Sequence, residues 1–152
     1  GLSNFEEKPL LLNEFRDMCE NILKSNLPFI ICEKNKYIIG FTYLNKFRNK
    51  SGYRFSFENS IYIDEKFTGI GVGAKLLKKL IEESKKNKDI KNIVAVIGGN
   101  NPIASIKIHK KNGFNMVGSL KKIGFKKNKW LDAIYMQKVL KYLVSRWHLT
   151  EE

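Results

Sequence analysis

Two hydrophobic periods alternate along this chain. Apolar residues recur at helical spacing over residues 13–25 and 72–87, which predicts two amphipathic helices. Runs rich in β-branched and aromatic residues predict strands between them, over residues 29–33, 37–43 and 55–63. The first two strands are separated by three polar residues, so we expect them to form a hairpin.

The second half of the chain is predicted from the same patterns. The continuous apolar run 93–97 is typical of a strand that is covered on both faces. A short helix is predicted over residues 104–111, ended by an Asn-Gly pair, and strands over 114–120 and 130–140 close the fold. This order predicts an α+β domain in which helices flank a central, mostly antiparallel mixed sheet.

The composition indicates one domain. The chain has 152 residues, of which 43% are hydrophobic, enough for a single core. No apolar run reaches the length of about eighteen residues that a membrane span needs, so we expect no membrane helix. Cys19 and Cys32 lack the spacing of metal ligands, which predicts no metal site and favours free thiols in a reducing compartment such as the cytoplasm.

The net charge of +13 first suggests a nucleic-acid partner. The basic residues are nearly all Lys, however, and they fall at solvent-facing helical positions and in turns rather than along one ribbon interleaved with aromatic residues. We therefore expect no nucleic-acid partner. The charge would instead help to attract an anionic ligand.

A glycine-rich turn separates the strand that ends at Ile63 from the next helix. It reads Gly69-Ile70-Gly71-Val72-Gly73-Ala74. Glycines let backbone N–H groups and the helix N-terminus approach an anion closely, so the turn predicts a phosphate-binding site. A P-loop is excluded because it needs four residues between its glycines and then Lys and a hydroxyl residue, and a dinucleotide fingerprint, Gly-x-Gly-x-x-Gly, matches only weakly.

A third kind of phosphate ligand is an acyl-CoA. Thr68-Gly69-Ile70-Gly71-Val72-Gly73 is similar to the acetyl-CoA signature of GCN5-related N-acetyltransferases (GNAT), Arg/Gln-x-x-Gly-x-Gly/Ala, with Thr68 in place of Arg or Gln. Residues 47–63 resemble the run Phe-Arg-x-Arg-x-x-Tyr-Arg-x-x-x-Glu-x-Ser-Val-Tyr-Val of the phosphinothricin acetyltransferase group, and residues 105–114 resemble its Ser-Ile-x-Leu-His-x-x-x-Gly-Phe helix. The resemblance extends from about residue 5 to residue 140.

The resemblance implies the GNAT fold, in which two neighbouring parallel strands splay apart and admit the acetyl-pantetheine arm. Here these strands would be residues 57–63 and 93–97. The resemblance also implies a first strand and helix that are absent from this sequence, so we expect a single N-acetyltransferase domain over residues 1–152, truncated at its N-terminus. A cytoplasmic homodimer is expected as well.

The resemblance further implies acetyl-CoA as the cosubstrate. Its pyrophosphate would lie on the glycine turn, and a backbone N–H near residues 61–63 would bind the thioester oxygen. The loop before Ser105 is one residue longer than in the group, so either Asn100 or Asn101 would contact the cofactor. The predicted cofactor-binding residues are Ile61, Tyr62, Ile63, Thr68, Gly69, Ile70, Gly71, Val72, Gly73, Ala74, Asn100, Asn101 and Ser105.

Two residues are candidates for proton transfer. Glu58 lies in an otherwise apolar and aromatic strand, where burial would raise its pKa, and it matches the catalytic Glu of the group, so we expect a general base rather than an outward-facing strand carboxylate. His109 stands where many relatives carry a Tyr that protonates the leaving thiolate. It lies four residues after Ser105 on one helical face, and it is either a general acid, a site-lining residue or a plain helix histidine.

The amino-acid substrate would be held by arginines, because Arg pairs in bidentate fashion with carboxylates. Arg48 and Arg54 are the candidates, with Tyr53 lining the pocket. The expected activity is acetyl transfer from acetyl-CoA to the α-amine of a small amino acid or analogue, such as phosphinothricin, methionine sulfoximine or methionine sulfone. The alternatives are acetylation of a polyamine or a protein amine, or an acyl-CoA-binding module without catalysis.

Overall fold

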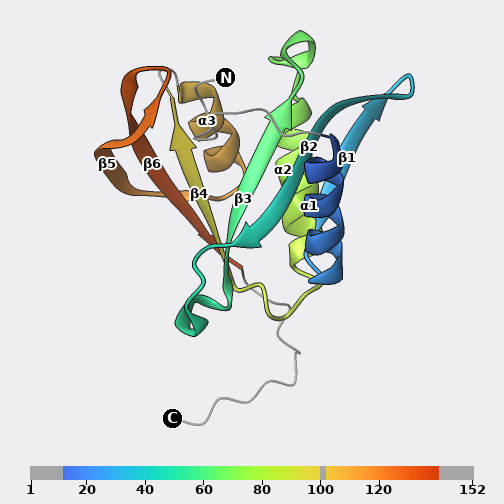
Figure 1. Ribbon diagram of the computed structural model, residues 1–152, viewed down its shortest axis with the longest axis horizontal. Helices are drawn as coiled ribbons and strands as arrows, with labels where there is room; N and C mark the ends of the chain where they lie inside the picture. The colour runs from blue at the N-terminus through green and yellow to red at the C-terminus, as the bar shows by residue number, and fades with distance from the viewer. Residues whose placement is uncertain (1–11, 100–101, 141–152) are drawn as a thin grey trace.

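A computed structural model describes residues 12–99 and 102–140 of the chain, which form a twisted sheet with helices on both faces (Figure 1). None of the helices in these residues is long and apolar enough to cross a membrane. The elements are, in chain order, α1 (Leu12–Lys24), β1 (Phe29–Lys34), β2 (Tyr37–Lys46), the 3-10 helix η1 (Ser51–Tyr53), β3 (Ser56–Ile63), the 3-10 helix η2 (Glu65–Phe67), α2 (Val72–Ser84), β4 (Asn92–Gly98), α3 (Ile103–Lys111), β5 (Asn115–Lys126) and β6 (Lys129–Val139).

The sheet has six strands in the order β1-β2-β3-β4-β6-β5. Only β3 and β4 are parallel, and every other neighbouring pair is antiparallel. The parallel pair is joined through α2, because parallel strands need a crossover connection. The predicted mixed, mostly antiparallel sheet is confirmed.

The helices cover opposite faces of the sheet. Phe15 of α1 lies 5.0 Å from the ring of Phe41 on β2, whereas Leu76 of α2 lies against Gly40, the preceding residue. Successive residues of a strand point to opposite faces, so α1 covers one face and α2 the other. We call these the α1 face and the α2 face.

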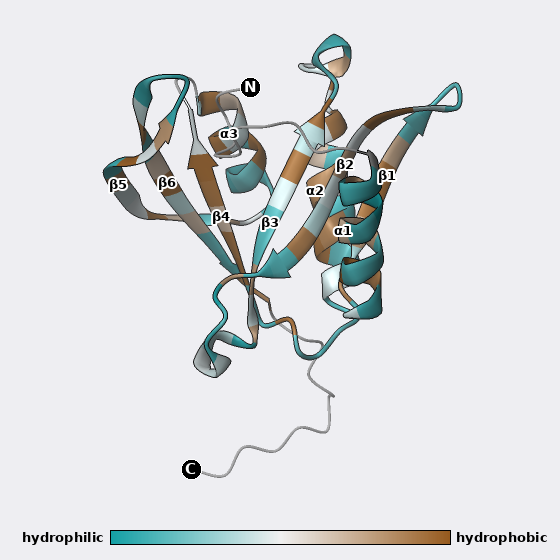
Figure 2. Ribbon diagram, viewed as in Figure 1, coloured by the Kyte–Doolittle hydropathy of each residue, from teal (hydrophilic) through white to brown (hydrophobic). Residues whose placement is uncertain are grey.

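The core lies mainly between α2, α3 and the sheet. Leu77 and Leu80 of α2 pack with Ile93 of β4 and Met136 of β6, and all four are fully buried. Hydrophobic residues follow β4 over most of its length (Figure 2), and most of the apolar residues of α2 are buried. β4 lies in the middle of the sheet, with Ile93, Ala95 and Ile97 buried on the α2 face. Val94 and Val96 on the α1 face are only partly buried, so the predicted cover on both faces is incomplete.

Strand β5 is longer than the sequence pattern predicts. The pattern ends near Leu120, but the strand continues to Lys126 after an irregularity between Leu120 and Gly124. The carboxylate of Asp132 accepts hydrogen bonds from the backbone N–H of Lys122 at 2.8 Å and from the Lys121 ammonium at 3.4 Å. These bonds hold the irregular segment against β6, which lets pairing resume.

Candidate active site

The parallel strands β3 and β4 pair along only half of their length. Their register runs from Ser56 opposite Asn92 to Asn59 opposite Ala95, and it stops there. Beyond this point β3 stays paired with β2 as far as Ile63, and β4 stays paired with β6 as far as Gly98. The two strands therefore diverge after Asn59; we call this divergence the splay and Asn59 its vertex (Figure 1). The inner edges of a splay leave backbone groups available to a ligand.

The glycine turn follows β3 at the wide end of the splay. Gly69 and Gly71 have positive φ values of 78° and 90°, which side-chain-bearing residues rarely adopt. A Cβ atom on either glycine would meet no protein atom within 4 Å, so the space beside the turn is clear of side chains. Gly71 is the N-cap of α2 and gives no side-chain cap to its first N–H groups. This is the geometry in which a helix N-terminus binds an anion.

Gly73 brings α2 close to its neighbours. A Cβ atom at this position would lie 2.8 Å from Cδ1 of Ile63 on β3 and 2.9 Å from Cδ1 of Ile108 on α3. Glycine is therefore needed for the start of α2 to lie against the end of β3. Thr68, which precedes the turn, donates its hydroxyl to the carbonyl of Glu65 at 3.0 Å and so ends η2.

Glu58 lies one residue before the vertex. Its side chain alternates with those of Phe57 and Asn59 and shares the α1 face with Ser60 and Tyr62. It is half-buried, and this burial raises the pKa of the carboxyl group, while the positive charge of Arg48 acts in the opposite direction. A carboxylate with a raised pKa at the start of a splay is suited to accept a proton.

The residues after the vertex continue along the splay. Ile61 and Ile63 point to the α2 face, towards the cluster of Ile39, Val72 and Leu76 at the start of α2. Tyr62 points to the α1 face, where its ring stacks on Phe41 at 4.9 Å. Their backbone, rather than their side chains, is what they present to the space between β3 and β4.

The three predicted substrate residues lie in the exposed loop between β2 and β3. The guanidinium of Arg48 lies 4.2 Å from the Phe47 ring, and Nη1 donates to the Phe47 carbonyl at 2.8 Å. Tyr53 lies edge-on to the same ring, with centroids 5.9 Å apart. Arg54 stacks on Phe55 and donates to the carbonyl of Ser51, so it is held within its own loop. Of the two arginines, Arg48 is the one whose charge lowers the pKa of Glu58.

His109 is a buried residue of α3 with both ring nitrogens engaged. It is 3% exposed, and its Nδ1 lies 2.7 Å from the carbonyl oxygen of Ser105. Its Nε2 lies 3.0 Å from Nδ2 of Asn59. Burial lowers the pKa of the imidazole, which favours the neutral form. Both ring nitrogens thus lie against protein partners, and a role of His109 as general acid stays a prediction.

Asn59 was not among the predicted site residues, although the alternation of side chains along β3 could have indicated it. It shares the α2 face of β3 with Phe57 and Ile61, where an asparagine is unusual. Two other predictions, Asn100 and Asn101, lie outside the described residues. In residues 12–99 and 102–140, no group of three or more His, Cys, Asp or Glu side chains is placed to hold a metal ion.

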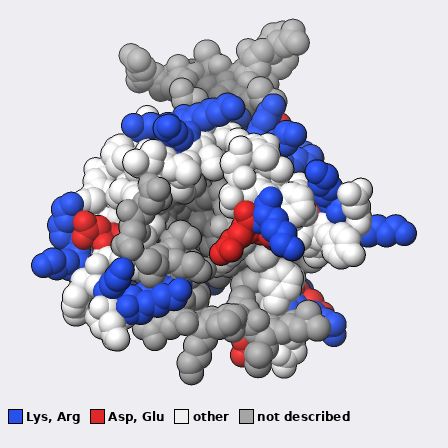
Figure 3. Space-filling model, turned by 90° about the horizontal axis from the view of Figure 1, so that it is seen from above, with Lys and Arg blue, Asp and Glu red and all other residues white. Residues whose placement is uncertain are grey.

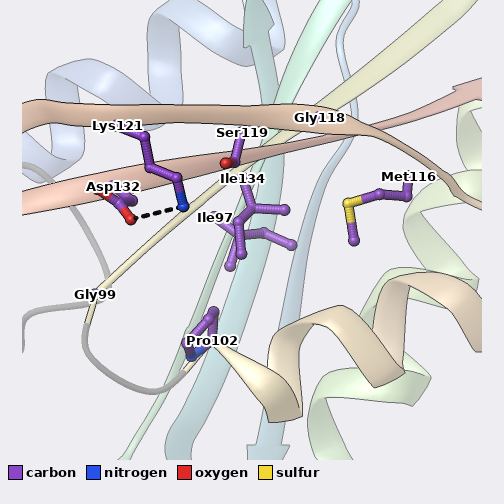
Figure 4. Close-up of a pocket in the computed structure, with 9 residues that line it drawn as sticks. All are labelled: Ile97, Gly99, Pro102, Met116, Gly118, Ser119, Lys121, Asp132 and Ile134. Carbon is purple, nitrogen blue, oxygen red and sulfur yellow. Dashed lines mark hydrogen bonds and ion pairs between the residues drawn. The ribbon is translucent and has the colours of Figure 1, made fainter.

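A cavity lies between the end of β4, β5, β6 and the start of α3 (Figure 4). Its volume is about 520 Å³. Ile97 and Ile134 point into it, and the ion pair between Lys121 and Asp132 lies at its rim. None of the predicted site residues lines it.

Basic side chains surround the end of the molecule that carries the glycine turn. Seen from this end, Lys and Arg residues lie on several sides of the molecular outline, and the acidic areas between them are small (Figure 3). Such a field favours the approach of an anionic ligand.

Known proteins are similar to this chain in sequence and fold. The family of acetyltransferase (GNAT) domains matches residues 5–135. The chain is 35% identical to the phosphinothricin N-acetyltransferase of Alcaligenes faecalis over 92% of its own length and 71% of that protein. The crystal structure of a GNAT superfamily phosphinothricin acetyltransferase from Sinorhizobium meliloti in complex with AcCoA matches with a TM-score of 0.85 and 34% identity, over 92% of this chain and 75% of that one.

A second solved structure matches equally well. It is the ribosomal-protein-alanine N-acetyltransferase from Brucella melitensis, with a TM-score of 0.86 and 33% identity over 91% of this chain and 85% of that chain. The splay and the glycine turn are the features that the sequence resemblance to this family led us to expect. The chain belongs to the GNAT family of acetyltransferases.

Proposed function

We propose that this chain transfers an acetyl group from acetyl-CoA to the α-amine of a small amino acid or amino-acid analogue. The observation that carries the proposal is the position of Glu58, a half-buried carboxyl beside the vertex of a splay whose wide end meets the glycine turn. The turn suits a pyrophosphate, the splay suits an extended arm, and Glu58 suits an amine that must lose a proton.

The fit of acetyl-CoA rests on the chain's own geometry. Gly69 and Gly71 leave room beside the N-terminus of α2, and the backbone of residues 61–63 faces the splay without pairing to β4. Acetyl-CoA would supply the thioester that the neutral amine attacks, and CoA would leave as its thiolate when the C–S bond breaks and the amide bond forms. A backbone N–H of β3 stabilises the charge that develops on the thioester oxygen, in the manner of an oxyanion hole.

Glu58 accepts the proton that the ammonium group of the substrate gives up, either directly or through one water molecule. Its raised pKa makes this transfer more favourable than it would be for an ordinary carboxylate. The charge of Arg48 acts on Glu58, and in this proposal Arg48 pairs with the carboxylate of the amino acid, while Tyr53 and Arg54 lie in the same loop.

A protein N-terminus is the second candidate acceptor, because one well-matching structure is a ribosomal-protein-alanine N-acetyltransferase. The loop that carries Arg48 is exposed, so an acceptor of either size can approach it from solvent. An acyl-CoA-binding module without turnover is the alternative outside enzymes.

We also propose that the chain forms a homodimer through the hairpin of β5 and β6. This hairpin exposes apolar side chains that are 46–63% accessible. They are Met116, Val117, Leu120, Ile123, Phe125 and Trp130. Exposed apolar side chains gathered on one hairpin mark an interaction surface, and a second copy carries the same hairpin. The free thiols of Cys19 and Cys32 are consistent with a protein of the reducing cytoplasm, which is the location we propose.

The test is an acetylation assay with detection of the product by mass. The panel contains phosphinothricin, methionine sulfone, methionine sulfoximine, spermidine and a peptide with an N-terminal alanine. We expect an acetylated amino-acid analogue, with kcat/KM at least about tenfold above that for the peptide, a difference of about 1.4 kcal/mol in activation free energy. A preference for the peptide would establish a protein N-terminus as the acceptor. If the chain binds CoA but forms no product, it would be an acyl-CoA-binding module without turnover.

A further inference from the structure

The side chain of Asn59 contains a buried acceptor without a partner. Asn59 is 7% exposed, and its Oδ1 atom has no hydrogen-bond partner among the described residues. A buried, unpaired carbonyl oxygen is costly, and proteins retain such groups mainly where a ligand or another group completes them. Asn59 occupies the vertex of the splay, directly after Glu58. The unpaired atom therefore belongs to a residue next to the proposed general base.

The hydrogen bonds of His109 fix which way the amide of Asn59 points. The carbonyl of Ser105 can only accept, so Nδ1 of His109 donates to it and carries the proton of the neutral ring. Nε2 is then an acceptor, and the Asn59 group that lies 3.0 Å away is the NH₂ group. Oδ1 is therefore directed away from His109. An imidazole that is itself held by Ser105 orients the free oxygen of Asn59.

The free oxygen lies on the side of the sheet from which the cofactor arm would come. Asn59 shares the α2 face with Ile61 and Ile63, and Ile63 lies next to Gly73 at the start of α2. Glu58 faces the other side. At the vertex, the α2 face thus carries a buried acceptor and the α1 face carries the carboxylate of Glu58, one residue apart.

We propose that Oδ1 of Asn59 accepts a hydrogen bond from an amide N–H of the pantetheine arm of acetyl-CoA, and that His109 is the positioning residue that holds this oxygen in place. The inference rests on the proposed use of acetyl-CoA. A hydrogen bond to Asn59 would fix how far the pantetheine arm enters the splay. A bond at the vertex would place the thioester next to Glu58. It would also give His109 a role without proton transfer.

The test measures the affinity for CoA directly, by calorimetry, so that turnover is not needed. We expect Asn59→Leu, which removes the acceptor at similar volume, to weaken CoA binding about tenfold, as the loss of one buried hydrogen bond predicts. His109→Phe should weaken binding to a similar extent, and the double variant should be no worse than either alone, since the two residues act as a unit. His109→Gln, whose amide oxygen can accept from Asn59, should retain most of the affinity.

Ser84→Ala is the matched control. It removes another fully buried hydrogen-bonding side chain, which donates to the carbonyl of Leu80 within α2 and lies far from the turn at its N-terminus. We expect its CoA affinity to equal that of the wild type. Melting temperatures of all variants, and two-dimensional NMR spectra of the His109 ring nitrogens, show whether each variant is folded and whether the ring is neutral with its proton on Nδ1.

The possible results separate the inference from the proposed function. If the wild type binds CoA, and folded Asn59→Leu and His109→Phe bind it equally well, Asn59 and His109 are only structural and the inference is wrong. If His109 carries its proton on Nε2, the orientation of Asn59 is wrong as well. If the wild type does not bind CoA at all, the proposed function falls together with the inference.

Discussion

At the scale of single residues, the balance between burial and charge around Glu58 sets the pH at which the site works. Burial raises the pKa of this carboxyl, and the positive charge of Arg48 lowers it. A general base must be deprotonated, so kcat/KM rises with pH as Glu58 loses its proton. Because burial is the larger effect, this rise should occur at a higher pH than for an ordinary glutamate.

Replacing Arg48 should change both substrate binding and this pH dependence. We expect Arg48→Gln to raise the KM for the amino acid about tenfold, because one carboxylate contact is lost. We also expect the acid limb of the kcat/KM profile to move to higher pH, since the charge that lowers the pKa of Glu58 is gone. Rates measured between about pH 5 and 9 would show both effects.

Arg54→Gln is the matched comparison for this experiment. Arg54 comes from the same loop and also stacks on an aromatic ring. The charge of Arg54, unlike that of Arg48, is not among the causes that shift the pKa of Glu58. Its replacement should leave the acid limb where it is. If the limb stays fixed in Arg48→Gln as well, then Arg48 does not influence the group that titrates.

At the scale of elements, the turn between β3 and α2 should tolerate no side chain in the presence of ligand. Gly71→Ala forces a residue with a Cβ atom into the left-handed region, at a cost of about 1–2 kcal/mol, although no protein atom lies within 4 Å of that Cβ. The same Cβ would occupy the space of the pyrophosphate. We expect the affinity for acetyl-CoA to fall by about two orders of magnitude, which is more than the loss of one hydrogen bond.

Calorimetric titration with acetyl-CoA measures this loss, and Gly118→Ala serves as the control. A Cβ atom added to Gly118 on β5 would also meet no atom within 4 Å, and the φ of Gly118 is not positive, so the added methyl group is free of both costs. Equal affinities of Gly71→Ala and Gly118→Ala would mean that the pyrophosphate does not lie on the turn.

Alternation and helical period were sufficient to predict most elements, because the core positions of α2, β3 and β4 repeat cleanly along the sequence. They did not predict the second half of β5. Its Lys121-Lys122 pair looks like a polar turn, but bonds to the distant Asp132 hold it beside β6, and backbone pairing resumes at Gly124. Long-range contacts of this kind leave no local pattern.

The candidate site was predicted in the same uneven way. Glu58 and the glycine turn have local signatures, an acid in an apolar strand and a glycine-rich segment before a helix. The burial of His109 and its bond to Asn59, 50 residues earlier in the chain, depend on how α3 packs against β3. Nothing in the spacing of Ser105 and His109 indicates that the ring turns inwards.

At the scale of the whole molecule, the apolar hairpin of β5 and β6 should control the oligomeric state. Light scattering coupled to size-exclusion chromatography should give twice the mass of one chain for the wild type. Val117→Lys, at a position that is 63% exposed on β5, should shift the mass towards that of one chain, because it buries a charge in the interface.

Val139→Lys provides the control for this shift. Val139 is 62% exposed and is the last residue of β6, two residues beyond Gln137, which pairs with the first residue of β5. It should leave the mass unchanged. A wild-type chain that elutes with the mass of a single copy would contradict the dimer.

The central claim is that Glu58 removes the proton from the amine, and the most direct measurement is the acetylation rate of Glu58→Gln with its best substrate. We expect kcat to fall about 100- to 1000-fold. The affinity for acetyl-CoA should stay unchanged, because Glu58 faces the opposite side of β3 from the glycine turn. Glu33→Gln, an exposed strand glutamate on β1, should keep full activity. A Glu58→Gln enzyme that turns over at the wild-type rate would contradict the claim.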